Sequence, residues 1–293
     1  MTNIKATVSD IIMLMKPRII LLLVITCAGG ALVATKGNMD ILYLDKIILT
    51  LIGLTFSAGG ANMVNMWYDQ DIDAVMERTK HRPLPAGRMH SRTVLALGIA
   101  FGVLSTVFLW VLVNPTTALM ALSGYLFYVF IYTMLLKRRT VQNIVIGGAA
   151  GAFPPLVGWA AVQNSVMDFL PWAMFAVIFL WTPPHFWALA LRVNADYTKA
   201  KIPMMPVVKG VDETKTQILY YMLILMPVTL AMAFFPPMGL LYLLAAAVLG
   251  IMWAFKGVRL LKAEGVGPAQ DVFRFSLYYL AILFAAMVLD TFV

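Results

Sequence analysis

Long apolar runs alternate with short polar connections along almost the whole chain. A helix that crosses the hydrocarbon core of a bilayer needs about 20 mostly apolar residues. We therefore predict nine transmembrane helices, over 19–35, 47–65, 93–113, 117–136, 143–162, 168–190, 216–235, 238–255 and 275–292. This pattern predicts an all-α polytopic membrane protein in which residues 1–293 form a single domain.

Composition supports a membrane protein. The chain is 61% hydrophobic and 12% charged, whereas soluble domains are typically about 45–50% apolar and about 25% charged. The single cysteine, Cys27, lies inside the first apolar run, where we expect it to be a small packing residue. The N-terminal segment shows neither a secretory nor an organellar presequence pattern. We therefore expect the inner (plasma) membrane of a prokaryotic cell.

The distribution of basic residues predicts the orientation of the nine helices. If the N-terminus is cytoplasmic, 20 of the 22 Lys and Arg residues fall inside, and only Lys36 and Lys46 fall outside. Such an excess of cytoplasmic basic residues is typical of membrane proteins. The long loops 66–92, 191–215 and 256–274 are then all cytoplasmic. The net charge of +8 is explained in this way, and no nucleic acid partner is expected.

Two proline pairs fall inside predicted membrane helices. Pro154-Pro155 lies in the fifth apolar run and Pro183-Pro184 in the sixth. Proline removes a backbone donor and clashes with the preceding turn, so we expect these pairs to kink or break their helices. Membrane proteins tolerate such breaks where the freed backbone groups line a cavity.

Three oxygen-bearing side chains follow the second apolar run at helical spacing. Asn65, Asp69 and Asp73 are related as i, i+4 and i+8, which places them on one face of a helix. Oxygen ligands converging in this way suit a hard cation such as Mg²⁺. The alternative is a solvated, charged helix end, but charges placed directly against a membrane span are costly and favour a site.

Basic residues surround this acidic stripe in the sequence. Arg78 and Arg82 follow it at a spacing of four, and their guanidinium groups can bind phosphate oxygens. Lys137 lies in the connection between the fourth and fifth predicted helices, where we also favour a phosphate-binding role. A metal site, phosphate-binding side chains and a membrane together predict an enzyme that acts on a lipid diphosphate.

The loop 191–215 carries a second candidate set. Asp196 is the first acid in that loop and, placed opposite the acidic stripe, could bind a second Mg²⁺ or share one. Lys199 and Lys201 follow it as candidate phosphate ligands. His185 precedes this loop, inside the sixth predicted helix. An intramembrane histidine suggests a ligand or a base, with a satisfied structural role as the alternative.

The first set of motifs resembles a known superfamily. Asn65-x-x-x-Asp69-x-x-x-Asp73, followed by Arg78-Thr79-x-x-Arg82-Pro83-Leu84, is similar to the aspartate-rich signature of the UbiA-type intramembrane aromatic prenyltransferases. The resemblance covers nearly the whole chain. It implies nine helices around a central cavity, Mg²⁺ as cofactor, metal binding by the stripe, and stabilisation of the leaving diphosphate by Arg78.

Within that superfamily, further motifs resemble the branch that farnesylates heme. They are Met76-Glu77-Arg78-Thr79, Pro184-His185 and Asp196-Tyr197-x-x-Ala200-x-Ile202-Pro203. The resemblance implies farnesyl diphosphate and heme B as substrates and heme O, made for terminal oxidases, as product. It also implies His185, Arg192 and Lys209 on the heme side. A heme A synthase and a terminal oxidase are the implied downstream partners.

One departure from the superfamily pattern keeps alternatives open. Quinone-type members carry a second D-x-x-x-D in the loop after the sixth helix, and here its second position is Ala200. The stripe 65–73 is then expected to carry most of the metal binding. The first alternative is a prenyltransferase acting on a quinone-precursor aromatic acid. The second is an ion-coupled transporter, although a transporter would place its ionisable residues near the bilayer midplane.

Overall fold

The computed structural model describes residues 4–38 and 44–293, with side chains from Val8 onward. Within this part of the chain, nine helices are long and apolar enough to cross a membrane, which confirms the predicted number. They are α2 (Pro17–Ala34), α3 (Leu44–Tyr68), α5 (Ser91–Leu112), α6 continued by η2 (Pro115–Leu126 and Phe127–Leu136), α7 with α8 (Asn143–Gly147 and Ala149–Gln163), α9 (Phe169–Arg192), α12 continued by η3 (Val211–Ala231 and Met232–Phe234), α13 (Leu240–Lys262) and α14 (Ala269–Thr291).

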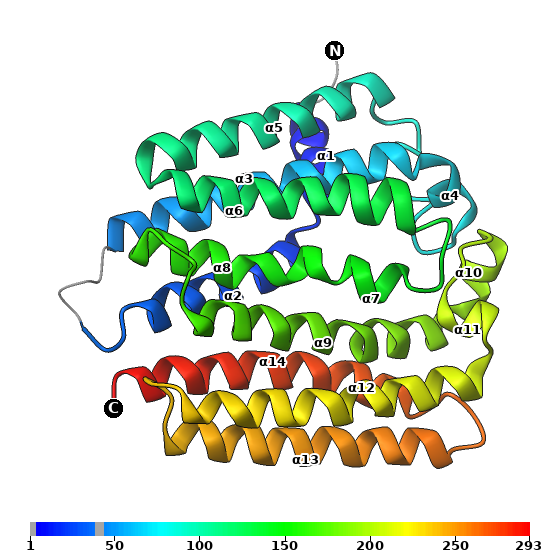
Figure 1. The fold of residues 1–293 in the computed structure, drawn as a ribbon. Helices are drawn as coiled ribbons and strands as arrows, with labels where there is room; N and C mark the ends of the chain where they lie inside the picture. The colour runs from blue at the N-terminus through cyan, green and yellow to red at the C-terminus, as the bar shows by residue number, and fades with distance from the viewer. Residues whose placement is uncertain (1–3, 39–43) are drawn as a thin grey trace.

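Four short helices accompany the long ones, and the hydropathy pattern predicted none of them. They are α1 (Ile4–Met15), α4 (Gln70–Val75), α10 (Asn194–Lys199) and α11 (Met205–Val208). Helices α4, α10 and α11 gather at one end of the bundle, and the C-terminus lies at the other end (Figure 1). Helix α1 runs at a steep angle to the long helices.

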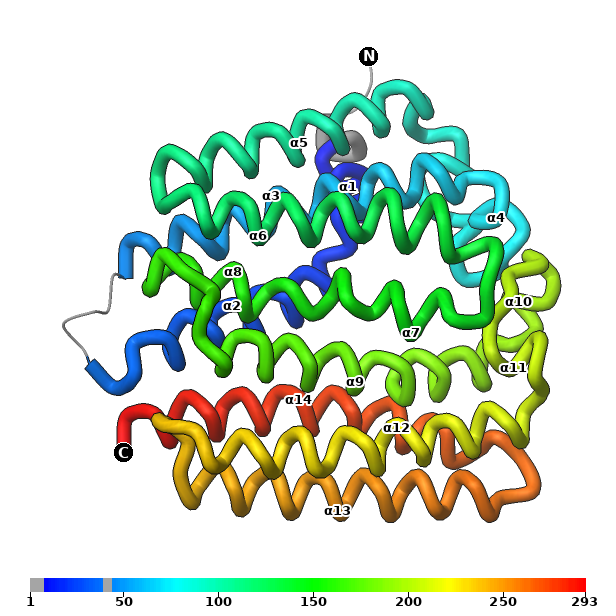
Figure 2. The backbone as a smooth tube through the Cα atoms, viewed as in Figure 1, coloured from blue at the N-terminus to red at the C-terminus, as the bar shows by residue number. Residues whose placement is uncertain are grey.

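The long helices form a closed ring that follows the order of the chain. Contacts run from α2 to α3, α5, α6, α8, α9, α12, α13 and α14, and α14 returns to α2. Figure 2 shows the backbone passing from α5 on one side of the bundle to α13 on the other. Helix α2 also packs against α8, and α14 against α9. Sequential elements that pack as neighbours are the usual arrangement in compact folds.

Small residues bring α2 and α8 into direct backbone contact. A Cβ atom built on Gly158 would lie 1.9 Å from the carbonyl oxygen of Cys27, and one built on Gly30 would lie 2.5 Å from that of Pro155. Cys27 is fully buried in this contact, as its predicted packing role requires. Close helix approach through small residues is a common way to associate helices in membranes.

Neither proline pair interrupts its helix. Helix α8 runs through Pro154-Pro155 and α9 runs through Pro183-Pro184, so the break expected at these positions is absent. The fifth membrane span is interrupted instead at Gly148, between α7 and α8. Beside the second pair, the Thr182 hydroxyl donates to the carbonyl of Ile178 at 2.7 Å. Neighbouring helices and hydroxyl side chains let a membrane helix accommodate proline.

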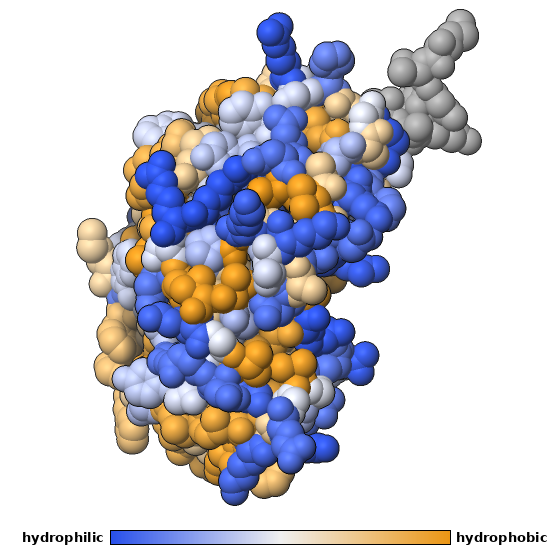
Figure 3. Space-filling view, turned by 90° about the vertical axis from the view of Figure 1, so that its right-hand side faces the viewer, coloured by the Kyte–Doolittle hydropathy of each residue, from blue (hydrophilic) through white to orange (hydrophobic). Residues whose placement is uncertain are grey.

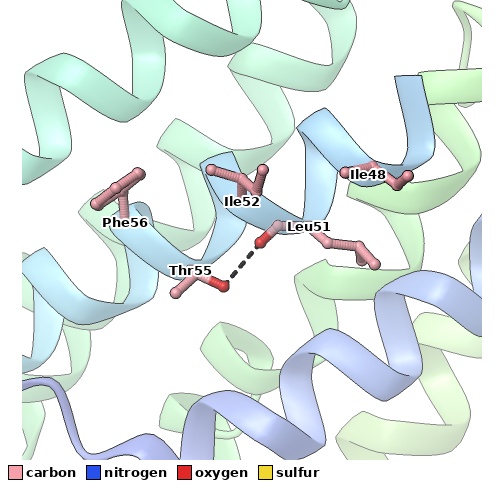
Figure 4. Close-up of a pocket in the computed structure, with 5 residues that line it drawn as sticks. All are labelled: Ile48, Leu51, Ile52, Thr55 and Phe56. Atoms are coloured by element: carbon pink, nitrogen blue, oxygen red, sulfur yellow. Dashed lines mark hydrogen bonds between the residues drawn. The ribbon is translucent and has the colours of Figure 1, made fainter. Parts of the chain in front are cut away.

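The outward faces of the long helices are apolar. Figure 4 shows a depression on the first half of α3 that is lined by Ile48, Leu51, Ile52, Thr55 and Phe56. The Thr55 hydroxyl donates to the Leu51 carbonyl at 2.7 Å, so it is already paired within the helix. The depression ends at Phe56, about 14 Å along α3 from Asn65, the first residue of the acidic stripe, at 1.5 Å per residue. It is part of the apolar exterior and offers no reactive group.

Candidate active site

The end of the bundle that carries α4, α10 and α11 is predominantly polar. Figure 3 views this end directly and shows hydrophilic side chains over most of it, with apolar patches between them. The acidic stripe enters this end from α3, and the predicted phosphate-binding residues come from the loops around it.

The acidic stripe spans two helices rather than one. Helix α3 ends at Tyr68 and α4 begins at Gln70, so Asp69 lies at the junction. Helical spacing nevertheless continues across it. The Asp69 N–H donates to the Asn65 carbonyl at 2.9 Å, and the Asp73 N–H donates to the Asp69 carbonyl at 2.8 Å. Asp69 is fully buried, and Asn65 and Asp73 are 3% exposed.

Asp69 is surrounded by donors from two parts of the chain, helix α3 and the residues that follow η2. Its Oδ2 accepts hydrogen bonds from the ammonium of Lys137 and from the Asn65 amide, the latter at 2.8 Å. Its Oδ1 lies 3.4 Å from an Arg138 nitrogen. The Asn65 amide also donates to the Thr133 hydroxyl at 3.1 Å. A fully buried carboxylate is therefore compensated by two cations and an amide, as a buried charge requires.

The other two stripe residues each hold a basic side chain as well. Arg82 donates to Asp73 Oδ2 at 2.6 Å, and the Lys16 ammonium donates to Asn65 Oδ1 at 2.8 Å. The Thr79 hydroxyl donates to the Asp73 carbonyl at 3.0 Å, which fixes the turn between Asp73 and Arg82. All three predicted metal ligands thus present an oxygen to a basic side chain.

A π-helical segment positions Lys137. Segment η2 has the wider π-helical winding up to Leu136, and the Lys137 N–H donates to the carbonyl of Tyr132, five residues back, at 2.9 Å. Within it, the Thr133 hydroxyl donates to the Tyr128 carbonyl at 2.8 Å. Such segments are rare and occur frequently at functional sites. The winding was not predictable from hydropathy.

Arg138 was not selected by the sequence analysis, yet it lies at the centre of the site. It binds both oxygens of Asp71 at 2.7 Å and the Tyr68 carbonyl at 2.9 Å, and it lies over the Tyr68 ring. Its hydrogen bonds hold the pKa of the exposed Asp71 carboxyl below its usual range. For Arg138 and Arg139, unlike Lys137, the sequence indicated membrane anchoring as strongly as phosphate binding.

Lys16 is a second residue that sequence reasoning missed. It precedes α2 in a left-handed conformation, with φ 59°, and its ammonium reaches Asn65. Burial, together with the charges of Arg82 and Lys137, lowers its pKa well below the usual range for lysine. The only signal in the sequence was a basic residue directly before the first span, and the general excess of basic residues on the cytoplasmic side explained that residue without any role in the site.

The second candidate set lies beside the site rather than on the buried carboxylates. Asp196, in α10, accepts hydrogen bonds from the backbone N–H groups of Glu77 and Arg78, both at 3.3 Å. It anchors the turn that follows α4. Lys199 lies 3.8 Å from Glu77 and is exposed, as is Lys201. The structure therefore groups Asp196 with Arg78 and keeps both lysines on the surface.

His185 is buried between α9 and α14, two helical turns before the end of α9. Its Nδ1 lies 2.6 Å from the Ser276 hydroxyl oxygen, and its ring stacks between Trp181 and Phe273. Arg192 ends α9 at the polar end of the bundle and is exposed there, and Lys209, after α11, is exposed as well. The three residues predicted on the heme side therefore differ in depth.

The stripe suits a hard divalent cation by its donor chemistry. In the described part of the chain, no three His, Cys, Asp or Glu side chains come together as a metal cluster on their own. The stripe instead combines two carboxylates with an amide oxygen, all of them directed at cations. Oxygen-only donors are what Mg²⁺ binds in proteins, usually with substrate phosphates as additional ligands.

The chain belongs to the UbiA prenyltransferase family, whose model matches residues 22–287. It is 50% identical over 285 residues to the protoheme IX farnesyltransferase of Symbiobacterium thermophilum, covering 97% of this chain and 94% of that protein. It is 48% identical over 280 residues to the protoheme IX farnesyltransferase of a Synechocystis species, covering 95% and 87%. Together with the nine candidate spans, this establishes a multi-pass membrane prenyltransferase.

Solved structures share the fold. A digeranylgeranylglyceryl phosphate synthase superposes with a TM-score of 0.78 at 18% identity, covering 97% of this chain and 98% of that one. A UbiA homologue from Archaeoglobus fulgidus, bound to DMAPP and Mg²⁺, gives 0.73 at 16% identity, covering 97% and 99%. The UbiA-type, nine-helix fold expected from the sequence is thereby confirmed.

Proposed function

We propose that this chain transfers a farnesyl group from farnesyl diphosphate to a vinyl group of heme B, with addition of water, to give heme O. The observation that carries the proposal is the buried stripe Asn65, Asp69 and Asp73, encircled by four basic side chains at one end of a membrane bundle. The names of the close, full-length relatives support the choice of substrates.

The reaction breaks the allylic C–O bond, a vinyl π bond and one O–H bond of water, and it forms a carbon–carbon bond and a carbon–oxygen bond. The C–O bond of the allylic diphosphate breaks, and its electron pair leaves on the diphosphate. The π electrons of a heme vinyl group then form a carbon–carbon bond to the farnesyl cation. The positive charge is then on the former vinyl carbon that is attached to the macrocycle. Water adds to this carbon and loses a proton, which leaves a hydroxyethylfarnesyl group. The site must hold the diphosphate firmly and exclude water until the carbon–carbon bond has formed.

The basic side chains stabilise the charge that develops on the leaving diphosphate. Lys137, Arg138, Arg82 and Lys16 already point at the stripe, so no large rearrangement is needed to bring them to phosphate oxygens. When bound at Asn65, Asp69 and Asp73, Mg²⁺ neutralises the leaving group as a Lewis acid. Arg78 contributes a fifth positive charge from the turn that Asp196 anchors, and Lys199 and Lys201 attract the diphosphate from the surface.

The positions of His185, Arg192 and Lys209 along the bundle axis are compatible with a heme that enters from the polar end. His185 and Arg192 are seven residues apart on α9, which places them on one helical face, about 10 Å apart along the axis. The propionates of a heme remain hydrated when they lie at the membrane edge, where Arg192 and Lys209 pair with them. The apolar ring edge with its vinyl groups then lies inside the bundle.

The cellular setting follows from charge and substrate. With the basic ends of the helices in the cytoplasm, the site opens to the cytoplasmic face of the inner (plasma) membrane. Farnesyl diphosphate reaches this face from the cytoplasm, and its tail occupies the apolar interior. A heme A synthase and a terminal oxidase are the proposed consumers of the product.

The test is an incubation of the purified protein with Mg²⁺, farnesyl diphosphate and either heme B, a hydroxybenzoate or a naphthoate. Mass spectrometry of the extracts identifies the prenylated acceptor. We expect prenylation of heme B alone, abolished by EDTA and by Asp69→Asn, which removes the buried carboxylate charge. Asp212→Asn is the matched control, because Asp212 is a fully exposed acid of α12.

The outcomes separate the alternatives. Prenylation of an aromatic acid in place of heme would assign the chain to the quinone type. No release of diphosphate with any acceptor would contradict a transferase and would favour ion-coupled transport. Full activity of Asp69→Asn would show that the stripe does not bind the diphosphate through a metal.

A further inference from the structure

His185 lies in a closely packed aromatic environment between α9 and α14. Its ring is 7% exposed and stacks between Trp181, at 4.2 Å between ring centroids, and Phe273, at 4.7 Å. The Trp181 indole N–H donates to the backbone carbonyl of Ser276 at 2.8 Å, which ties α9 to α14 beside the histidine. The ring is therefore fixed on both faces.

The hydrogen bonds around Ser276 determine which histidine nitrogen carries the proton. The Ser276 hydroxyl oxygen lies 2.6 Å from the Phe273 carbonyl oxygen and 2.6 Å from His185 Nδ1. Ser276 has one hydroxyl hydrogen for these two short contacts. A carbonyl oxygen cannot donate, so the hydroxyl donates to Phe273. The contact with Nδ1 is then attractive only if Nδ1 carries a hydrogen and donates it to Ser276.

A neutral imidazole with hydrogen on Nδ1 has a free lone pair on Nε2. Among the described residues, Nε2 has no hydrogen-bond partner, and it is not one of the fully enclosed, unpaired atoms. It therefore borders accessible space. Histidines that bind metals usually donate their other N–H to a fixed acceptor, which sets the tautomer and makes the free nitrogen more basic.

We propose that Ser276 is a positioning residue that fixes the Nδ1–H tautomer of His185, so that Nε2 binds the iron of the heme substrate. The chain of donors runs from His185 Nδ1 to Ser276 and on to the Phe273 carbonyl. The stacked Trp181 and Phe273 rings hold the plane of the imidazole, and the contact with Ser276 selects the orientation in which Nδ1 faces α14. This inference rests on the proposed function, because heme B is the acceptor assumed there.

The location of His185 agrees with a bound heme. His185 lies two turns deeper than Arg192 on the same face of α9. Iron ligation at that depth leaves the propionates at the polar end, beside Arg192. Ligation of the iron would hold the macrocycle in one register, so that one vinyl group faces the farnesyl cation in every turnover.

The test is a titration of heme B into the purified protein in lipid nanodiscs, without farnesyl diphosphate. Absorption and ferric EPR spectra report the axial ligand independently of turnover. We expect an imidazole-ligated heme in the unaltered protein, its loss in His185→Gly, and its return when free imidazole is added. We expect Ser276→Ala to weaken heme binding by about 10- to 100-fold, and Ser276→Thr, which keeps the hydroxyl, to restore most of the affinity.

Ser105→Ala is the matched control. Ser105 is also a buried helical serine, and its hydroxyl donates only to the Gly53 carbonyl, at 2.7 Å. Unchanged unfolding temperature and unchanged farnesyl diphosphate affinity of Ser276→Ala show that the fold is intact. An unaltered heme spectrum in His185→Gly, or unaltered affinity in Ser276→Ala, overturns the inference while heme farnesylation stands. Failure of the unaltered protein to farnesylate heme B overturns the proposed function itself.

Discussion

If Asp69 binds the metal as proposed, Lys137 competes with that metal when no substrate is bound, and we expect removal of Lys137 to have two opposite effects. Its ammonium is hydrogen-bonded to Asp69 Oδ2, with the lysine side chain 17% exposed and the carboxylate fully buried. A hydrogen bond to a charged group contributes about 1.5–3 kcal/mol. Asp69 must give up its hydrogen bond with Lys137 when a divalent cation binds it in the free protein.

Lys137→Met is therefore expected to tighten metal binding to the substrate-free protein by about 10- to 100-fold, at about 1.4 kcal/mol per tenfold. The same variant loses one positive charge at the leaving diphosphate, which is expected to lower turnover by about 10²- to 10³-fold. Binding of Mn²⁺, followed by EPR, measures the first effect. Release of diphosphate measures the second.

The control is Lys262→Met, which removes an exposed lysine in the last turn of α13 that has no role in the proposed site. Asp69→Asn in the Lys137→Met background should abolish the gained Mn²⁺ affinity, which locates the metal. If Lys137→Met binds Mn²⁺ no more tightly than the unaltered protein, the basic side chains do not stand in for the metal. The proposed competition between Lys137 and the metal for Asp69 is then wrong.

Three further substitutions test other parts of the structure. Arg82→Gln should lower turnover by about 10²-fold, because it removes the guanidinium that is bound to Asp73 at 2.6 Å. Arg82→Lys should recover only part of the lost turnover, because lysine lacks the guanidinium fork. Equal turnover of both variants would contradict a bidentate role for Arg82. Arg88→Met should raise the KM for farnesyl diphosphate by about fivefold, equivalent to about 1 kcal/mol. The reason is that Arg88 connects the loop after α4 to α1 through its ion pair with Asp10, at 2.9 Å. An unchanged KM would show that the loop does not depend on this ion pair. Gly158→Ala should destabilise the protein by at least about 1–3 kcal/mol, because its Cβ would meet the Cys27 carbonyl, whereas Gly151→Ala has open space and should not lower the unfolding temperature.

Much of the fold was predictable because the bilayer imposes a simple rule on the sequence. Each predicted span overlaps an observed one, and most boundaries differ by only a few residues, as for 19–35 against α2 (Pro17–Ala34). The short helices were missed because none exceeds 12 residues, so no apolar run of membrane-spanning length marks them. The break at Gly148 and the π-helical segment before Lys137 depend on packing between helices, which local hydropathy does not record.

The candidate site was predictable where its residues are neighbours in sequence, and less so where they are not. Asn65, Asp69 and Asp73 share a helical period, so their spacing alone indicated a common face. Lys16 meets Asn65 across 49 residues and Arg138 meets Asp69 across 69. In the sequence, Lys16 is a basic residue before the first span, and Arg138 fitted membrane anchoring as well as phosphate binding. Only the folded ring brings the start of α2 and the end of η2 to the same stripe of residues.

The most direct test is the mass of the heme recovered after the purified protein, heme B, farnesyl diphosphate and Mg²⁺ react in ¹⁸O-labelled water. We expect heme B increased by one farnesyl group and one labelled water, formed only when Asp69 is intact. Unmodified heme accompanied by labelled farnesol would show that water, and not a heme vinyl group, captures the farnesyl cation. That result would contradict heme farnesylation by this chain.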